Sequence, residues 1–218
     1  MKYVQIISSR PIGKRCYQLA ARMLPEGWRL VEETYKPHNL GEGGVVISVL
    51  YADVITDFYP KQRYYNFHPG ILPQYAGSAT LSWSILNGER EAGCTLHELV
   101  REVDGGDVIE IRKFPLMPWD TAQSAAAKFT EVAEWMFVDW FVKLLEGNVV
   151  GESQDKSLRR NYKRNEIRKE LDLTRRIRAF TFEGKDEPFF VTRDGQRFNL
   201  SFDRGVIIPK PHHDEEII

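Results

Sequence analysis

Three side chains of complementary chemistry lie beside glycine and proline residues in the middle of the chain. Asn66 and His68 belong to Asn66-Phe67-His68-Pro69-Gly70, and Asp104 opens Asp104-Gly105-Gly106. An amide can donate a hydrogen bond to a developing oxyanion, an imidazole can carry a proton near neutral pH, and a carboxylate can orient or charge that imidazole. Acyl transfer without a metal or a covalent nucleophile needs these groups, so we predict a catalytic site formed by all three.

Each of these residues, taken alone, also has a simpler structural explanation. Asn before a turn and Asp before two glycines commonly form turns, and a single His beside Pro is often structural or merely exposed. The combination with the surrounding pattern favours catalysis. For His97, which lies in a predicted strand, we expect a structural or supporting role.

The overall composition is that of a soluble globular chain. Its 218 residues suit one domain with an appendage, and 42% of them are hydrophobic. Thirty basic residues stand against 31 acidic ones, so the net charge of -1 gives no argument for binding nucleic acid or an anionic membrane. Neither the two cysteines, Cys16 and Cys94, nor the histidine spacings indicate a metal site. With no signal-peptide pattern and no membrane-spanning run, we expect a cytoplasmic protein without a metal.

Short apolar runs alternate with helical patterns up to about residue 150. Strands are expected over residues 3–7, 28–35, 45–50, 63–67, 93–100 and 108–114, with helices over 11–24, 79–86 and 121–145. This alternation predicts an open α/β sheet whose ligands lie outside the carboxyl ends of the strands. The strand over 63–67 would bring Asn66 and His68 to that edge, and the strand over 93–100 would lead to Asp104.

The composition changes from Gly151 onward. Residues 156–178 are rich in Lys and Arg, which is typical of a solvated helix face, and Asp194-Gly195 between alternating runs predicts a β-hairpin. We therefore expect a catalytic domain over 1–150 and a small C-terminal appendage with a β-hairpin over 151–218, ending in a frayed acidic tail.

Five short motifs follow one another through the centre of the chain. They are Asn66 to Pro69, Leu72-Pro73-Gln74-Tyr75-Ala76-Gly77, Asn87-Gly88-Glu89, Gly93-Cys94-Thr95-Leu96-His97 and Asp104-Gly105-Gly106. In this order and spacing they resemble the folate-dependent formyltransferase family. Residues 45–55 are similar to the strand and loop that line the folate pocket in that family. The resemblance implies a Rossmann-like formyltransferase sheet and N10-formyltetrahydrofolate as co-substrate.

The chain departs from the family pattern in two respects. Only 65 residues precede Asn66, so a strand–helix unit before Val45 is expected to be missing or abbreviated. Gly70 stands in place of the usual Ser after His-Pro, and Ala76 in place of the common Arg before Gly77. The first departure affects which substrate is expected, because the missing region helps to hold the substrate. The second affects how the loop contacts the substrate, and the three catalytic groups are intact.

The C-terminal residues 176–190 and the hairpin after them are similar to the tail of sugar N-formyltransferases, which act on nucleotide-linked amino sugars. Methionyl-tRNA formyltransferases carry a larger C-terminal domain, and glycinamide ribonucleotide formyltransferases usually stop soon after the core helix. The resemblance therefore implies formyl transfer to a nucleotide-linked amino sugar, and a homodimer formed through the hairpin. The alternatives are formylation of glycinamide ribonucleotide or methionyl-tRNA, hydrolysis of the formylated folate, and a folate- or nucleotide-binding module without turnover.

The resemblance also implies a role for each catalytic group. Asn66 would donate to the oxyanion formed when an amine attacks the formyl carbon. His68 would stabilise that oxyanion and move the proton of the amine, and Asp104 would pair with His68.

Two further sets of residues are expected to bind the substrates. Folate is expected to contact backbone groups and a shallow apolar wall formed by Leu50, Tyr51, Ala52, Asp53 and Val54. The amino-sugar nucleotide is expected at Ser8, Ser9, Arg10, Tyr75 and Gly77. The first three of these lie between a strand and a helix N-terminus, a place that favours a phosphate, although simple helix capping is the alternative.

Overall fold

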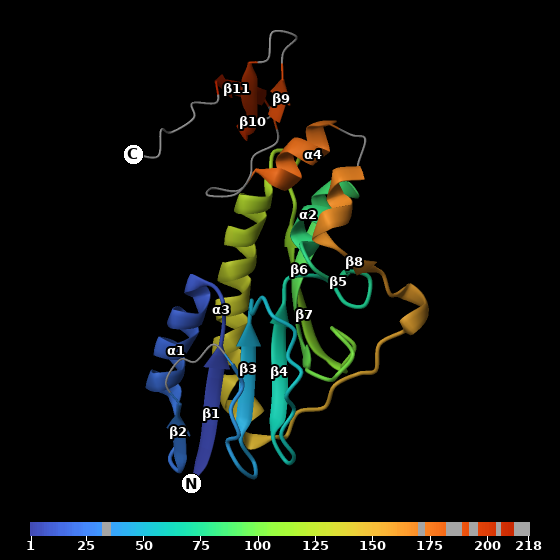
Figure 1. Ribbon diagram of the computed structural model, residues 1–218. Helices are drawn as coiled ribbons and strands as arrows, with labels where there is room; N and C mark the ends of the chain where they lie inside the picture. The colour runs from blue at the N-terminus through green and yellow to red at the C-terminus, as the bar shows by residue number, and fades with distance from the viewer. Residues whose placement is uncertain (32–35, 170–172, 182–188, 192–195, 204–205, 212–218) are drawn as a thin grey trace.

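A six-stranded sheet, ordered β2-β1-β3-β4-β6-β7, forms the centre of the computed structural model (Figure 1). The structure describes residues 1–31, 36–169, 173–181, 189–191, 196–203 and 206–211. The strands of the sheet are β1 (Lys2–Ile7), β2 (Trp28–Leu30), β3 (Val45–Val49), β4 (Arg63–His68), β6 (Glu91–Glu98) and β7 (Val108–Pro115). The first four pair in parallel, and β6 and β7 add to them antiparallel. The predicted Rossmann-like α/β sheet is confirmed.

The two long helices, α1 (Pro11–Met23) and α3 (Ala122–Glu146), pack against the main hydrophobic core. Pro11 stands in the first turn of α1, where its missing N–H costs nothing. Thr121 and Ser124 form a capping box at the start of α3, and Gly147 ends that helix with a φ of 81°. The short helix α2 (Thr80–Leu86) lies between β4 and β6 in the chain. These helix limits agree with the sequence patterns.

A smaller apolar cluster lies on a separate part of the sheet. Among the described residues, loops and not helices cover this cluster. Its buried members Ile7, Val46 and Tyr64 are packed by partly buried side chains from loops, namely Leu40, Tyr51, Ile55, Phe58 and Leu99. Residues 36–44 and 51–62 contain no helix. This agrees with the abbreviated N-terminal half, because β2 is followed by coil over 36–44 before β3 begins. Of the strand predicted over 28–35, the structure shows 28–30, while residues 32–35 lie outside the described part.

The C-terminal appendage consists of α4 (Leu173–Phe180) and a three-stranded antiparallel sheet. The strands are β9 (Phe189–Val191), β10 (Arg197–Asp203) and β11 (Val206–Pro211), with β10 in the centre. The predicted hairpin is therefore present and gains a third strand. Its turn at 192–195, the run 182–188 and the acidic tail at 212–218 lie outside the described residues.

The basic stretch over residues 156–178 does not form the single helix face that its composition indicates. It contains the 3₁₀ turn η1 (Lys156–Leu158), the strand β8 (Asn161–Tyr162), the 3₁₀ stretch η2 (Arg164–Lys169) and part of α4. Strand β8 pairs in parallel with β5 (Ala76–Gly77). Residues 161–162 are therefore extended, although the composition of the stretch indicates a helix. Within the described ranges, no helix is long and apolar enough to cross a bilayer.

Candidate active site

The pairing of β4 with β6 decides which side chains share one face of the sheet. Asn66 lies opposite His97, and Phe67 lies opposite Leu96. Because successive strand residues point to opposite faces, Phe67 and Leu96 enter the main core while Asn66, His68 and His97 share the other side. The two antiparallel strands thus bring an amide and two imidazoles together near the carboxyl end of β4.

Asp104 completes this group from the loop between β6 and β7. Strand β6 ends at Glu98, so the strand predicted to lead to Asp104 is shorter than expected, and Asp104 itself has a left-handed backbone with a φ of 51°. Its Oδ1 lies 3.3 Å from Nδ1 of His68 and 3.7 Å from Nε2 of His97, and Oδ2 accepts a 2.8 Å hydrogen bond from the Gly77 N–H. The structure therefore places the carboxylate beside both imidazoles.

The His68 ring is held at both of its nitrogens. Nε2 lies 2.6 Å from the carbonyl oxygen of Tyr75, and a carbonyl can only accept, so Nε2 carries a hydrogen. Nδ1 faces Asp104, and His68 is only 3% exposed. A ring with a hydrogen on each nitrogen satisfies both contacts. No pattern in the sequence marks the Tyr75 carbonyl as a partner, because a main-chain acceptor leaves no side-chain signature.

His97 has a defined tautomer and holds the amide of Asn66. Its Nδ1 lies 2.7 Å from the Glu98 carbonyl oxygen and must donate to it, which leaves Nε2 to accept from Nδ2 of Asn66 at 3.1 Å. Complete burial, reinforced by the nearby His68, lowers the pKa of His97 to about 4, although Asp104 opposes this shift. His97 is therefore neutral at pH 7, and the second N–H of the Asn66 amide is left for a ligand. The supporting role expected for His97 agrees with this geometry.

We expect the buried, neutral His97 to make the fold less stable in mild acid. In the unfolded chain His97 takes up a proton near its ordinary pKa of 6.5, whereas in the folded chain it stays neutral down to about 4. The unfolded state binds more protons in that window, so the free energy of unfolding falls as the pH drops from 6.5 to 4, by about 3 kcal/mol. Urea unfolding at a series of pH values measures this, and His97→Gln should flatten the dependence.

His38→Gln is the matched control for that experiment, since His38 is an exposed histidine whose backbone N–H bonds Gln5 and whose backbone carbonyl bonds Gln62. It should keep the pH dependence of the parent protein. Equal slopes for the parent and His97→Gln between pH 4 and 6.5 would contradict the assignment of a neutral, buried His97.

The residues predicted to bind folate form a loop at the carboxyl end of β3. The Leu50 carbonyl accepts from the Ser9 N–H at 3.3 Å, and the Ala52 N–H donates to Oγ of Ser9 at 3.0 Å. Tyr51 packs in the smaller apolar cluster, whereas the residues Ala52, Asp53 and Val54 are exposed. The loop is thus tied to the end of β1 and leaves its outer residues accessible to a ligand.

The proposed phosphate residues are partly engaged by the protein itself. Ser8 is 3% exposed, and its Oγ accepts from the Arg10 N–H at 3.1 Å, while Ser9 bonds the β3 loop. Arg10 is the N-cap residue of α1, its side chain makes no capping hydrogen bond, and it is exposed. Ser9 and Arg10 are both exposed, and Arg10 is the charged one of the two.

Tyr75 and Gly77, the other predicted acceptor residues, make contacts that shape the site. The Tyr75 hydroxyl donates to Glu89 at 2.6 Å and accepts from Asn87 at 3.0 Å, so its backbone carbonyl rather than its phenol meets His68. Burial, together with the Glu89 bond, raises the pKa of this phenol. The Gly77 N–H is used by Asp104.

The glycine at position 70 has a steric reason. A Cβ built there would lie 2.5 Å from the Tyr75 carbonyl oxygen and 2.8 Å from Nε2 of His68. The usual Ser would not fit this arrangement of ring and carbonyl. Gly70, in place of the usual Ser, therefore leaves room for the close contact between His68 and the Tyr75 carbonyl.

A hollow of about 400 Å³ opens beside the amino-terminal half of β4. Aromatic, aliphatic and charged residues line it, namely Phe58, Tyr59, Gln62, Arg63, Tyr64, Tyr65, Glu98, Leu99, Val100, Arg101, Gly147 and Val149. Tyr64 lies two residues before Asn66 on the same strand face. In the described part of the chain, no three His, Cys, Asp or Glu side chains are grouped as metal ligands.

Comparisons with known proteins agree with this geometry. Residues 41–141, which include Asn66, His68, His97 and Asp104, match the family model of formyl transferases. The chain is 26% identical over 155 residues to a methionyl-tRNA formyltransferase of Listeria welshimeri, covering 69% of this chain and 49% of that protein. A Thermotoga maritima methionyl-tRNA formyltransferase is 28% identical over 116 residues, 52% of this chain and 37% of that protein. The chain thus spans about half, or less, of the length of these curated relatives.

Solved structures share the fold over nearly the whole chain. A sugar N-formyltransferase from a Shewanella species superposes with a TM-score of 0.77 at 18% identity, covering 93% of this chain and 97% of that one. An N-formyltransferase from Helicobacter canadensis, solved with folinic acid and dTDP-3-aminofucose, gives a TM-score of 0.73 at 16% identity and covers 98% of this chain and 100% of that one.

Proposed function

We propose that this protein transfers a formyl group from N10-formyltetrahydrofolate to the amino group of a nucleotide-linked amino sugar, because residues 41–141 match the family model of formyl transferases. One observation carries the proposal. Asp104, 36 residues after His68 in the sequence, comes to the face of the sheet that carries Asn66 and His68, with 3.3 Å between His68 and Asp104. An amide, an imidazole and a carboxylate in this arrangement suit amine attack on a formyl carbon.

The second N–H of Asn66 stabilises the oxyanion that forms as the amine nitrogen bonds to the formyl carbon. His97 keeps that amide in place by accepting its other hydrogen. His68 gives its Nε2 hydrogen to the folate nitrogen as the bond from that nitrogen to the formyl carbon breaks, and the ring, now neutral and still paired with Asp104, takes the proton that the amine must lose. The Nε2 hydrogen of His68, which points to Tyr75 in this structure, turns to the substrates for this step.

The surfaces around Asn66 suit the formyl donor. The hollow beside β4 offers aromatic and aliphatic walls from Phe58, Tyr64 and Leu99, which suit a flat ring system. The β3 loop over residues 50–54 offers exposed backbone at the neighbouring strand end. We propose that the donor occupies the hollow and this loop, with its formyl group at Asn66.

The nucleotide sugar is favoured as acceptor by the solved structures and by the small appendage. The Helicobacter protein was solved with an aminosugar nucleotide, and coverage of the structural relatives extends through α4 and the three-stranded sheet. We place the phosphates of the acceptor near Arg10, where α1 begins. The sheet of β9, β10 and β11 is our proposed contact for a homodimer, and the division at residues 150 and 151 remains our proposed domain boundary.

A transfer assay with a panel of acceptors tests the proposal. The protein is incubated with N10-formyltetrahydrofolate and with thymidine-, uridine- or guanosine-linked amino sugars, and formylated product is detected by mass spectrometry. We expect product from one sugar in the parent and none with His68→Ala. Folate binding without product from any acceptor would refute the enzymatic proposal.

Methionyl-tRNA is the second candidate acceptor, because the curated relatives from Listeria welshimeri and Thermotoga maritima are methionyl-tRNA formyltransferases. It belongs in the same assay as a separate arm. Product from methionyl-tRNA, with none from the sugars, would move the assignment to that substrate.

A further inference from the structure

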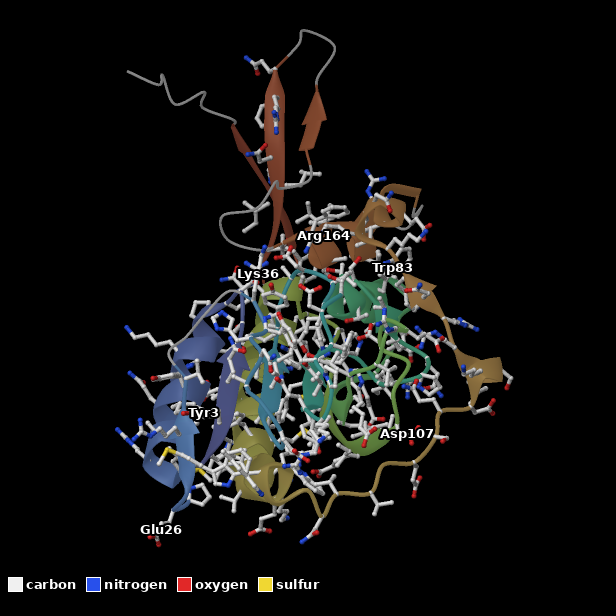
Figure 2. The ribbon with its side chains drawn as sticks, turned by 60° about the horizontal axis from the view of Figure 1, so that its bottom comes forward. Tyr3, Glu26, Lys36, Trp83, Asp107 and Arg164 are labelled. Carbon is white, nitrogen blue, oxygen red and sulfur yellow. The ribbon has the colours of Figure 1, made fainter. Side chains whose placement is uncertain are left out.

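After helix α3 the chain returns to the candidate active site, passing outside β7 (Figure 1). We call residues 148–162, which join the end of α3 to β8, the strap. In Figure 1 the strap runs from the lower end of α3, outside β7 and its loop, up to β8. Figure 2 shows it passing Asp107, to which Ser153 donates at 3.1 Å, before it reaches the region of Trp83. The strap lies beyond the family match at residue 141.

Two strap side chains hold the backbone of Asp104. Nε2 of Gln154 donates to the carbonyl oxygens of Asp104 at 2.9 Å and of Gly106 at 2.6 Å. Nη1 of Arg159 donates to the same Asp104 carbonyl at 3.0 Å, and Nη2 donates to the carbonyl of Val103. Since carbonyl oxygens only accept, the orientation of the Gln154 amide is fixed by its neighbours.

The same strap also holds the loop that faces the Asp104 carboxylate. The Arg160 carbonyl accepts from the Ala76 N–H at 3.0 Å, and the Tyr162 carbonyl accepts from the Ser78 N–H at 2.9 Å. Between these two bonds lies Gly77, whose own N–H donates to Oδ2 of Asp104. The strap therefore joins the two loops that meet at the catalytic carboxylate.

The backbone of Asp104 needs external support. Its φ of 51° is in the left-handed region, which is sterically unfavourable for most residues with a side chain. A rotation there would swing the carboxylate away from His68. The hydrogen bonds from Gln154 and Arg159 to the Asp104 carbonyl oppose that rotation. Only 16% of the Arg159 side chain is exposed, so its bond is largely shielded from water.

We propose that Gln154 and Arg159 are positioning residues that hold the Asp104 carboxylate against His68 and the Gly77 N–H. The inference rests on the proposed function, in which Asp104 is the partner of His68. It makes the strap, outside the matched family segment, part of the catalytic machinery.

Amide hydrogen exchange of Gly77, followed by NMR on the full chain, tests this without any substrate. Gln154→Leu and Arg159→Met should each speed exchange of the Gly77 amide about tenfold, because its acceptor Asp104 moves away. Exchange of Ser78, which bonds Tyr162, should stay unchanged. Lys156→Met, an exposed strap lysine that contacts Glu102, is the matched control and should change neither amide.

Steady-state kinetics with the acceptor found above give the second readout. Each variant should lose about tenfold in kcat with an unchanged KM, and neither should lose more when combined with Asp104→Asn. Arg159→Lys keeps a charge and one donor, so it should recover part of the loss and serves in place of Arg159→Met if that variant does not fold.

Unchanged Gly77 exchange in folded Gln154→Leu and Arg159→Met would overturn the inference, as would kinetic losses that add fully to that of Asp104→Asn. A parent protein that transfers formyl to none of the acceptors would refute the proposed function. The exchange result would still decide whether the strap positions Asp104.

Discussion

Asn66→Ala is expected to lower kcat by 10²- to 10³-fold. The substitution removes the donor that faces the oxyanion, and loss of one such donor costs about 2.7–4 kcal/mol of transition-state stabilisation. It also leaves Nε2 of His97 without the amide that it accepts from at 3.1 Å. The measurement is kcat at saturating donor and acceptor, with thermal unfolding to show that the fold persists.

Asn148→Ala is the control for this result, because Asn148 is an exposed asparagine just after α3. It should leave kcat within twofold of the parent. Asn66→Asp adds a sharper comparison, since its carboxylate has nearly the same shape but cannot donate. If either substitution at Asn66 leaves kcat within fivefold of the parent, another group supplies the oxyanion donor.

Gly77→Ala should damage both the stability of the fold and the activity of the enzyme. Gly77 has a φ of +96°, and a Cβ there would overlap the Tyr162 carbonyl and lie 2.5 Å from Oδ1 of Asn161. Overpacking of this kind typically costs 1–3 kcal/mol, and the left-handed backbone adds about 1 kcal/mol. The β5–β8 pairing must open to accept the methyl group, which also moves the N–H that holds Asp104. Urea unfolding and kcat measure the two effects.

Gly41→Ala separates the steric effect from the backbone effect. Gly41 has a φ of +77°, but a Cβ there would meet nothing within 4 Å. This variant should lose about 1 kcal/mol of stability and no activity. Equal losses of stability in the two variants would show that the contact between Gly77 and β8 adds no steric cost. Full activity in Gly77→Ala would show that this contact does not affect the position of Asp104.

Elements with a strong local signal could be predicted from the sequence. The β-branched run at residues 45–49 is a strand buried along its whole length, and Thr121 and Gly147 mark the ends of α3. Asn66, His68 and Asp104 could be chosen because their types and neighbours fit a reaction. Their close approach is confirmed, while their catalytic roles stay predictions.

The remaining features depend on contacts that no local pattern encodes. Strand β6 ends at Glu98, and Asp104 lies six residues further on, in a loop where its φ is 51°. Gln154 and Arg159 lie in a polar stretch without periodicity, and their partners are carbonyl oxygens about 50 residues earlier. Main-chain acceptors can be occupied by many residue types, so their partners become visible only in three dimensions.

The antiparallel pairing of β4 with β6 has a consequence for how this enzyme could change over evolution. Asn66 meets His97 across the two strands, and the neighbouring pair, Phe67 and Leu96, faces the core. Replacing any one of these side chains alters one contact. Inserting or deleting a single residue within β6 would instead exchange the polar and apolar sides of the strand, so that an imidazole entered the core and a leucine entered the site. Lineages descended from this chain can therefore explore substitutions along β6, whereas changes in its length are restricted to the loops at either end.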